Sequence, residues 1–121
     1  MQKLKTFLFI SAFLIYGGAY AQTAPNDAST AAMVALCQDL KDQDAQNFCF
    51  GFGEGVYQAY LANRNPNSKP SICFPNQNNS REQILKDFLA WNQKNPQYGK
   101  ERVAKTLMRF FAQQYPCSAG K

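Results

Sequence analysis

Apolar residues recur at helical spacing in four stretches of the chain, with polar residues between them. In residues 29–41 they follow the i, i+3, i+4, i+7 pattern of one helix face, and the same period runs through residues 45–62, 80–92 and 99–114. No stretch shows the alternation that is typical of a strand. The pattern predicts an all-α fold, a compact bundle of about four helices in two antiparallel hairpins. The main apolar positions are Met33, Leu36, Cys37, Leu40, Phe48, Phe52, Val56, Tyr60, Ile84, Leu85, Phe88, Leu89, Trp91, Val103, Leu107, Phe110 and Phe111.

The second stretch contains three glycines on alternate positions: Gly51, Gly53 and Gly55. Each costs a helix roughly 0.5–1 kcal/mol relative to alanine. Such residues suit a helix that another backbone or a cysteine bridge must approach closely. We therefore predict that residues 45–62 form the central buried helix, with the other helices packed on its glycine and aromatic faces. A phosphate-binding glycine loop is the disfavoured alternative, because no strand precedes this stretch and no Lys-Ser/Thr pair follows it.

The segments between the predicted helices have loop composition. Residues 63–70 hold two prolines and three asparagines, residues 71–75 form a short extended segment, and residues 76–79 continue the loop. Residues 93–98 connect the third and fourth helices. Ser80 and Gln83 fit a capping box, in which each side chain binds the backbone N–H of the other.

The N-terminal stretch fits a secretory signal peptide. Lys3 and Lys5 precede an apolar run over residues 7–16, and a small-x-small cleavage site ends at Ala21. A membrane anchor is the alternative, but the run is short for a span of about 20 residues. We predict cleavage after Ala21 and one helical domain over residues 22–121.

Charge narrows the class of partner. The whole chain has a formal net charge of +5, and removal of Lys3 and Lys5 leaves 11 basic and 8 acidic residues, a net charge of +3. This mild excess suits an acidic protein partner and is too weak to indicate nucleic acid or a membrane surface.

Four cysteines in an exported chain predict a disulfide framework. Three pairings are possible, and the expected turns favour one of them. Cys37 and Cys49 are equidistant from Gln43 in the first turn, and Cys73 and Cys117 are equidistant from Asn95. Antiparallel hairpins bring such residues together, so we predict Cys37–Cys49 and Cys73–Cys117. The chain has no His and no Cys-x-x-Cys, which disfavours a zinc site.

Catalytic residues are hard to place in this sequence. Without His, neither a Ser-His nor a Cys-His nucleophile is available, and we predict neither enzymatic activity nor a cofactor. Glu54, between two glycines, is the most unusual carboxylate, with a solvated helix position as its simplest interpretation. Arg102, Lys105 and Arg109 form a basic stripe that is either the solvated face of the last helix or a rim for an acidic partner.

Four motifs, in order, resemble one family. The Cys49–Tyr60 stretch is similar to its glycine-containing helix, and Ile72-Cys73-Phe74-Pro75 to its Ile-Cys-x-Pro element. The segment from Gln83 to Pro96 resembles its third helix, and Tyr115-Pro116-Cys117 its terminal Phe-Pro-Cys. The chain is thereby identified as resembling the Rap/Tai immunity proteins of bacterial type VI secretion, over roughly residues 37–117. It departs from the family at Gln58, often Asp, at Asn95, often His, and at Asn78-Asn79, which replace an apolar-Thr start.

The resemblance implies a periplasmic, non-enzymatic helical inhibitor, often a homodimer, that binds a peptidoglycan amidase toxin and blocks its active-site cleft with a protruding loop. Two polar loops fit this role, and we favour the one between the third and fourth helices because a rigid hairpin flanks it. The candidate contact residues are Gln93, Lys94, Asn95, Gln97 and Tyr98, and then Asn65, Asn67 and Lys69.

Two other classes of function remain open at this point. A small periplasmic chaperone-like protein would bind unfolded clients through exposed apolar surface, and the absence of His argues mildly against a switch near neutral pH. An enzyme is the third class, and it would lose turnover on a change of Glu54 alone.

Overall fold

Four α-helices make up the described part of the chain, as predicted. The computed structural model describes residues 27–74 and 79–118, so the predicted signal peptide lies outside the described residues. The helices are α1 (Thr30–Cys37), α2 (Gln43–Asn63), α3 (Arg81–Lys94) and α4 (Val103–Gln114), with a short 3-10 helix, η1 (Pro96–Tyr98), between the last two. Within these ranges the only β pairing is two isolated bridges. None of the described helices is long and apolar enough to cross a membrane.

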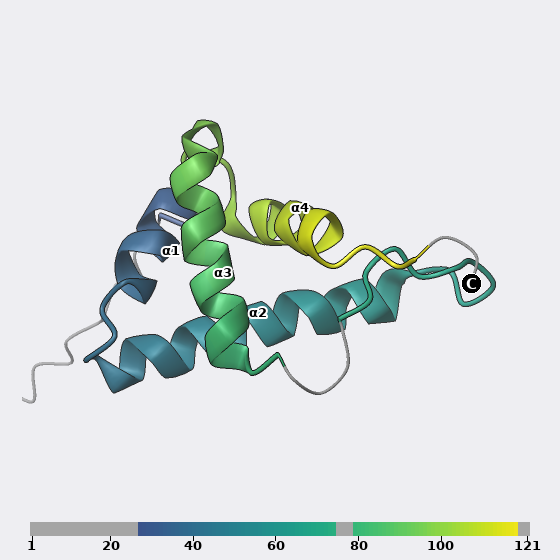
Figure 1. The fold of residues 1–121 in the computed structure, drawn as a ribbon, viewed down its shortest axis with the longest axis horizontal. Helices are drawn as coiled ribbons and strands as arrows, with labels where there is room; N and C mark the ends of the chain where they lie inside the picture. The colour runs from purple at the N-terminus through teal and green to yellow at the C-terminus, as the bar shows by residue number, and fades with distance from the viewer. Residues whose placement is uncertain (1–26, 75–78, 119–121) are drawn as a thin grey trace, which may run out of the picture.

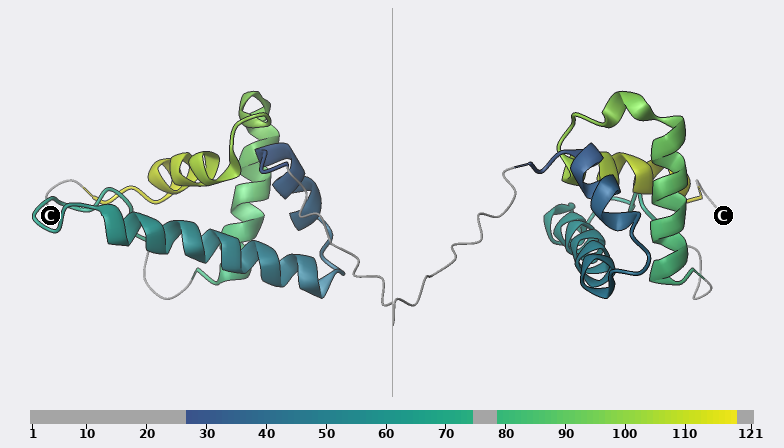
Figure 2. Two further views of the ribbon diagram at one scale, coloured as in Figure 1. Left: turned by 180° about the vertical axis from the view of Figure 1, so that it is seen from behind. Right: turned by 90° about the vertical axis from the view of Figure 1, so that its left-hand side faces the viewer.

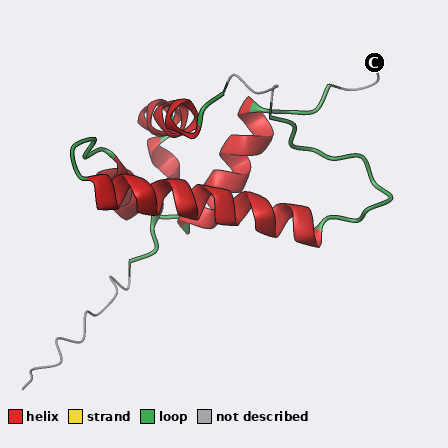
Figure 3. Cartoon of the chain, turned by 90° about the horizontal axis from the view of Figure 1, so that it is seen from below, coloured by secondary structure: helices red, strands yellow, loops and turns green. Residues whose placement is uncertain are grey.

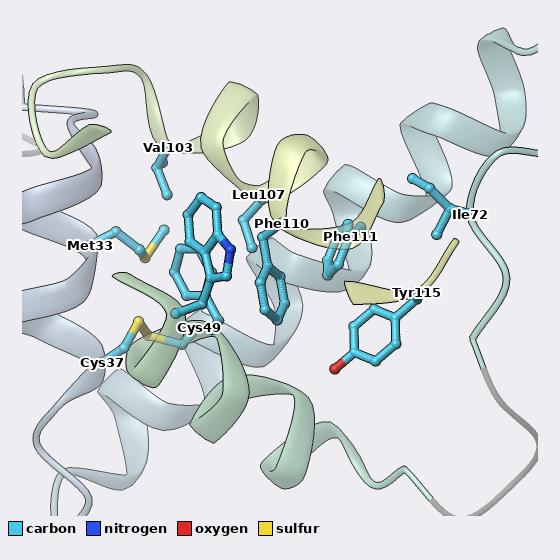
Figure 4. Close-up of a cluster of buried hydrophobic side chains, with 11 residues drawn as sticks. Met33, Cys37, Cys49, Ile72, Val103, Leu107, Phe110, Phe111 and Tyr115 are labelled. Atoms are coloured by element: carbon cyan, nitrogen blue, oxygen red, sulfur yellow. A yellow bond between two sulfur atoms is a disulfide. The ribbon is translucent and has the colours of Figure 1, made fainter. Parts of the chain in front are cut away.

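The helices pack as one cluster in which each contacts the other three. In Figure 1, α3 lies across α2. The right-hand view of Figure 2 shows α4 between α1 and α3. This arrangement encloses a single core, drawn in Figure 4, with the Cys37–Cys49 disulfide at one end and Ile72 and Tyr115 at the other.

The first helix ends at Cys37 and not at the predicted Lys41. The Asp39 carboxylate accepts the backbone N–H of Lys41 at 3.1 Å, which favours a turn over another helical residue. The buried Gln46 amide then donates to the carbonyl oxygens of Cys37 and Asp39, at 2.9 and 3.0 Å. A side chain of α2 therefore satisfies the last carbonyl of α1 and one carbonyl of the following turn, and helical periodicity does not report this contact.

The ends of α2 and α3 differ slightly from the predicted ones. Helix α2 begins at Gln43, two residues early, because the Asp42 side chain accepts the Ala45 N–H at 3.0 Å. Ser80 caps α3 as predicted, accepting the Gln83 N–H at 3.2 Å. The reciprocal half of the capping box is wrong, since the Gln83 amide donates to Asp87 at 2.8 Å.

The fourth helix begins at Val103 and not at Gly99, because residues 99–102 pair with the start of α1 and the residues just before it. The N–H of Thr30 donates to the Glu101 carbonyl at 2.8 Å, and the N–H of Val103 donates to Ala28 at 2.9 Å. Below this pairing the hydroxyl oxygens of Thr30 and Thr106 are 2.7 Å apart, and both residues are almost completely buried. Their mutual hydrogen bond satisfies both hydroxyl groups, so the two polar side chains can be buried without a large loss of stability.

The prediction that α2 is the central buried helix is wrong. Helix α4 holds that position, with Val103, Thr106, Leu107, Phe110 and Phe111 buried and Phe110 fully inaccessible. On α2 the buried residues are Ala45, Gln46 and Cys49, near its N-terminus. Phe48, expected on its inward face, is 53% exposed.

The glycines of α2 do not accommodate a neighbouring helix of this chain. A Cβ atom added at Gly51, Gly53 or Gly55 would meet no atom within 4 Å. Within the described residues, the predicted close approach at these positions is therefore absent. Gly51 and Gly55 are exposed on the outer face.

Both predicted disulfides are confirmed. Cys37–Cys49 joins α1 to α2 with a Cα–Cα distance of 6.0 Å, and Cys73–Cys117 joins the segment after α2 to the segment after α4 at 4.8 Å. The second bond continues a short antiparallel contact, in which the Cys73 N–H donates to the Tyr115 carbonyl at 2.8 Å.

Candidate functional site

The segment from Arg64 to Pro70 projects beyond the end of α2. Figures 1 and 3 show it as a loop that extends past the four helices. Apart from the half-buried Arg64, every residue in it is exposed, including the predicted contact residues Asn65, Asn67 and Lys69. It is the most protruding described segment that offers polar side chains to a partner.

Internal hydrogen bonds give this loop a defined shape. The Asn65 side chain accepts the Asn67 N–H at 2.9 Å, and the Asn65 carbonyl accepts the Ser68 N–H at 3.0 Å. The Arg64 guanidinium donates to the Ser68 carbonyl at 3.0 Å, which closes the loop from its base. Asn65 therefore shapes the turn, whereas the side chains of Asn67 and Lys69 have no such role.

Tyr60 holds the far end of the loop against α2. Its hydroxyl accepts the backbone N–H groups of Ser71 and Ile72, at 2.8 and 3.3 Å. A hydrogen bond with the Ser71 side chain, together with the two amides, lowers the pKa of Tyr60 below its ordinary value. Ile72 is buried and the Cys73–Cys117 disulfide follows it, so both ends of the loop are fixed.

The other predicted loop, residues 93–98, is largely helical. Gln93 and Lys94 belong to the last turn of α3, and residues 96–98 form η1. The Asn95 amide donates to the Trp91 carbonyl at 2.8 Å and so terminates α3. Gln93, Lys94 and Gln97 are exposed, but Asn95 serves the helix end.

Tyr98 packs within the fold and does not project from it. Its ring stacks on Trp91 with centroids 5.5 Å apart, and the Arg109 guanidinium lies 4.2 Å from its centroid. Arg109 in turn contacts Glu101 at 3.2 Å. This stack joins α3, η1 and α4.

The structure does not bring the two candidate loops together. Figure 1 places residues 93–98 at the upper end of α3, away from the Arg64–Pro70 loop at the end of α2. Both views of Figure 2 agree with this separation. A partner contacting both would have to extend across α4.

The predicted basic stripe on α4 is partly structural. The Arg109 side chain is only 31% exposed, and its buried Nε atom has no hydrogen-bond partner among the described residues. Lys105 lies 3.9 Å from the same Glu101 carboxylate that contacts Arg109. Arg102, which precedes the helix, is exposed. The stripe therefore offers two exposed cations to a partner.

The described residues do not assemble a recognisable catalytic or metal centre. Glu54 is exposed and accepts a hydrogen bond from the Gln58 amide one turn away, at 2.8 Å. In residues 27–74 and 79–118, no three His, Cys, Asp or Glu side chains come close enough to hold a metal ion. All four cysteines are paired.

The outer face of α2 is a further surface, which the sequence patterns did not indicate. Phe48, Gly51, Gly55, Ala59 and Ala62 follow helical spacing, and all are exposed. Their three- and four-residue spacing places them on one face of a helix, but the spacing does not say whether that face is buried or exposed.

The family model for Rap1a immunity proteins matches residues 29–117. The match covers all four helices and both disulfides. No curated protein and no solved structure matches the chain.

Proposed function

The chain belongs to the family of Rap1a immunity proteins, and on that premise we propose that it binds and inhibits a peptidoglycan amidase toxin of type VI secretion. The observation that carries the proposal is the family match over residues 29–117, nearly the whole described fold. The protein would protect its cell by blocking the active-site cleft of the toxin and would have no activity of its own.

We further propose that it acts in the periplasm. The predicted signal peptide of residues 1–21 would export it there, where a peptidoglycan amidase finds its substrate. Two disulfides support this location, because such bonds form and persist in oxidising compartments.

The Arg64–Pro70 loop is our first candidate for the segment that enters the cleft. Its projection, internal hydrogen bonds and two fixed ends mean that little conformational freedom would be lost on binding. A second candidate contact, called the α3 corner, lies at the C-terminal end of α3 and in η1, and consists of Gln93, Lys94 and Gln97. This order reverses the preference from sequence, because Asn95 and Tyr98 are occupied in packing.

Inhibition of purified amidases by the oxidised protein tests whether the Arg64–Pro70 loop enters the cleft. Asn67→Trp adds bulk at the loop without removing a side-chain hydrogen bond, and Lys69→Glu reverses a charge there. We expect each to weaken inhibition at least tenfold, because interface contacts at a central plug dominate binding. Lys41→Glu, the same change in the exposed turn before α2, is the matched control and should retain inhibition.

Two results would count against this assignment. If the folded protein inhibits no amidase of its source strain, the proposed function fails. A second result would move the contact. If the protein inhibits an amidase, and Lys94→Glu weakens that inhibition while Asn67→Trp and Lys69→Glu do not, then the α3 corner and not the Arg64–Pro70 loop blocks the cleft.

We also propose a homodimer that forms through the outer face of α2. The small side chains of Gly51, Gly55, Ala59 and Ala62 would let a second helix approach closely, and burial of Phe48 would add apolar contact. Such an interface would account for glycines that no other described part of the chain approaches closely.

Sedimentation analysis tests the dimer. Ala59→Arg should shift the protein to monomer, whereas Ala104→Arg, at an exposed alanine of α4, should leave the dimer intact. A wild-type chain that is monomeric at high micromolar concentration would refute this interface.

A further inference from the structure

The outer face of α2 has the spacing of a helix–helix seam. It consists of Phe48, Gly51, Gly55, Ala59 and Ala62, which are all exposed. The steps between these residues are 3, 4, 4 and 3 positions, so they recur every 3.5 residues on average. Two helices with that period pack side by side at about 20°, with contact along the whole seam. The outer face therefore fits one long helix, running beside α2 for about four turns.

The spacing of the outer face is symmetric about Gly55, because the steps read the same in both directions. Two copies with antiparallel α2 helices would place Gly55 against Gly55, and Phe48 of each chain against Ala62 of the other. Each bulky ring would then meet a small side chain. A parallel pair would instead oppose the two Phe48 rings and the two Ala62 methyl groups, and the seam would be crowded at one end and loose at the other.

Charges of opposite sign lie at the two ends of α2. The turn before α2 and its first residues hold three aspartates and one lysine, whereas the Arg64–Pro70 loop holds two cations and no acidic residue. Among the described residues none of these groups forms an ion pair. Figure 1 shows the turn and the loop at opposite ends of α2. The helix has 21 residues, so these ends are about 30 Å apart and cannot neutralise each other across a Debye length of about 8 Å.

An antiparallel second copy would supply the missing counter-charges. With Gly55 at the centre, Asp44 of one chain is level with residue 66 of the other, inside the Arg64–Pro70 loop. The aspartates of each chain would then face Arg64 and Lys69 of its copy. A parallel pair would bring aspartates to aspartates and cations to cations, which is unfavourable. Shape and charge thus select the same orientation.

We propose that two copies pair antiparallel along the outer face of α2, with a two-fold axis at Gly55. The aspartates at the start of each α2 then flank the Arg64–Pro70 loop of the other chain. This geometry rests on the homodimer proposed above and adds its orientation. It also makes each candidate toxin-binding loop depend on both chains, because its own chain fixes the two ends and the second chain supplies the counter-charge.

Cysteine cross-linking of the oxidised, exported protein tests the orientation. All four native cysteines are paired, so each variant adds one free thiol. Gly55→Cys should give a disulfide-linked dimer, because such a bond needs Cα atoms within about 7 Å and the monomer has room for the side chain. Phe48→Cys alone should not cross-link, since its two thiols would lie about 21 Å apart along the helices. A mixture of Phe48→Cys and Ala62→Cys should.

The cross-linking pattern separates the orientation from the dimer itself. Ala104→Cys, on the exposed side of α4, is the control and should stay unlinked. Cross-linking of Phe48→Cys with itself and of Ala62→Cys with itself would mean parallel helices, which would overturn this proposal and leave the interface standing. A dimer in sedimentation that none of the three outer-face cysteines links would overturn both.

Charge reversal tests the contact between the aspartates and the loop. Asp44→Lys should raise the dissociation constant of the dimer at least fivefold, and adding Lys69→Glu should restore it to within twofold of wild type. Glu82→Lys is the matched control, because Glu82 is also the exposed second residue of its helix, and it should leave the constant within twofold. An unchanged or lower constant in Asp44→Lys would overturn the contact.

Salt gives a further test that needs no substitution. Raising the salt concentration from about 0.05 M to about 0.5 M should weaken the dimer, because screening removes the attraction between the ends of α2. A parallel pair would tighten instead, since screening would remove repulsion, and tightening would contradict the proposal. Neither measurement uses the toxin, so a failure to inhibit any amidase leaves these tests intact.

Discussion

Gly51 and Gly55 lie in the interior of α2, where glycine costs a helix stability. Glycine in a helix predicts that another group approaches closely, but no side chain or backbone among the described residues approaches these two. Both residues are exposed on α2. Their cost to the monomer is then uncompensated within the fold, which is why we assign them to an interface between chains.

Gly51→Ala should stabilise the isolated monomer. The new Cβ atom meets nothing within 4 Å, and alanine favours a helix over glycine by roughly 0.5–1 kcal/mol. Urea unfolding at a concentration where the chain is monomeric measures the difference. Gly99→Ala is the control and should not stabilise, because its Cβ atom would lie 3.3 Å from the Pro96 carbonyl oxygen. Destabilisation by Gly51→Ala would mean that α2 has an intramolecular neighbour there.

Tyr115 should give the fold a pH dependence in the alkaline range. Burial, with the Asp87 charge and the hydrogen bond to it, raises the pKa of Tyr115 to about 12. Since the folded pKa lies above the unfolded value of about 10, the stabilisation is complete below pH 10 and is lost as pH rises toward 12.

Denaturant unfolding between pH 9 and 12 measures this loss. We expect a decrease on the order of 1–2 kcal/mol that belongs to Tyr115, from 1.36 kcal/mol per pKa unit and partial solvent access. Tyr115→Phe should lower stability at pH 9 and flatten the profile above pH 10. An unchanged slope in Tyr115→Phe would show that another group causes the alkaline loss.

At the scale of elements, helical period and turn midpoints predicted much of the fold. The four helices and both disulfide pairs follow from the spacing of apolar residues and cysteines. The helix ends were less predictable, because contacts between elements decide them. The Gln46 side chain, on α2, binds the Cys37 carbonyl at the end of α1. The pairing of Glu101 with Thr30 keeps residues before Val103 out of α4. Local sequence does not report such contacts.

The candidate site was predictable only in part. Composition predicted a loop over residues 63–70, because prolines and clustered asparagines disfavour a continued helix, and the structure ends α2 at Asn63. The role of Tyr60 in holding that loop depends on a contact eleven residues away along the chain. Likewise, the helical period places the residues on the outer face of α2 on one side of the helix, but it does not say whether that side faces the core or the solvent.

The Cys37–Cys49 bond should be a main source of stability for α1, which has only 8 residues. Helices this short are marginal without tertiary support. Replacing both cysteines by alanine should cost roughly 3 kcal/mol for a loop of this length, and more if the buried site cannot close. Chemical denaturation measures the loss, and a cost below about 1 kcal/mol would mean that packing alone holds α1.

At the scale of the whole molecule, the fold places its contact surfaces around one core. The Arg64–Pro70 loop projects at the end of α2, the exposed stripe of α2 faces outward, and the α3 corner lies elsewhere. This division would allow one chain to bind the proposed toxin and the proposed second copy at once.

Protection of living cells tests whether the proposed contact with the toxin makes the cell immune. The full chain, with its signal peptide, is co-expressed with each periplasm-directed type VI amidase of its source strain, and lysis is scored. We predict that the chain prevents lysis by one amidase and not by its relatives, and that Asn67→Trp loses this protection while Lys41→Glu keeps it. Lysis by every amidase, in cells that contain the folded and oxidised protein, would contradict the account.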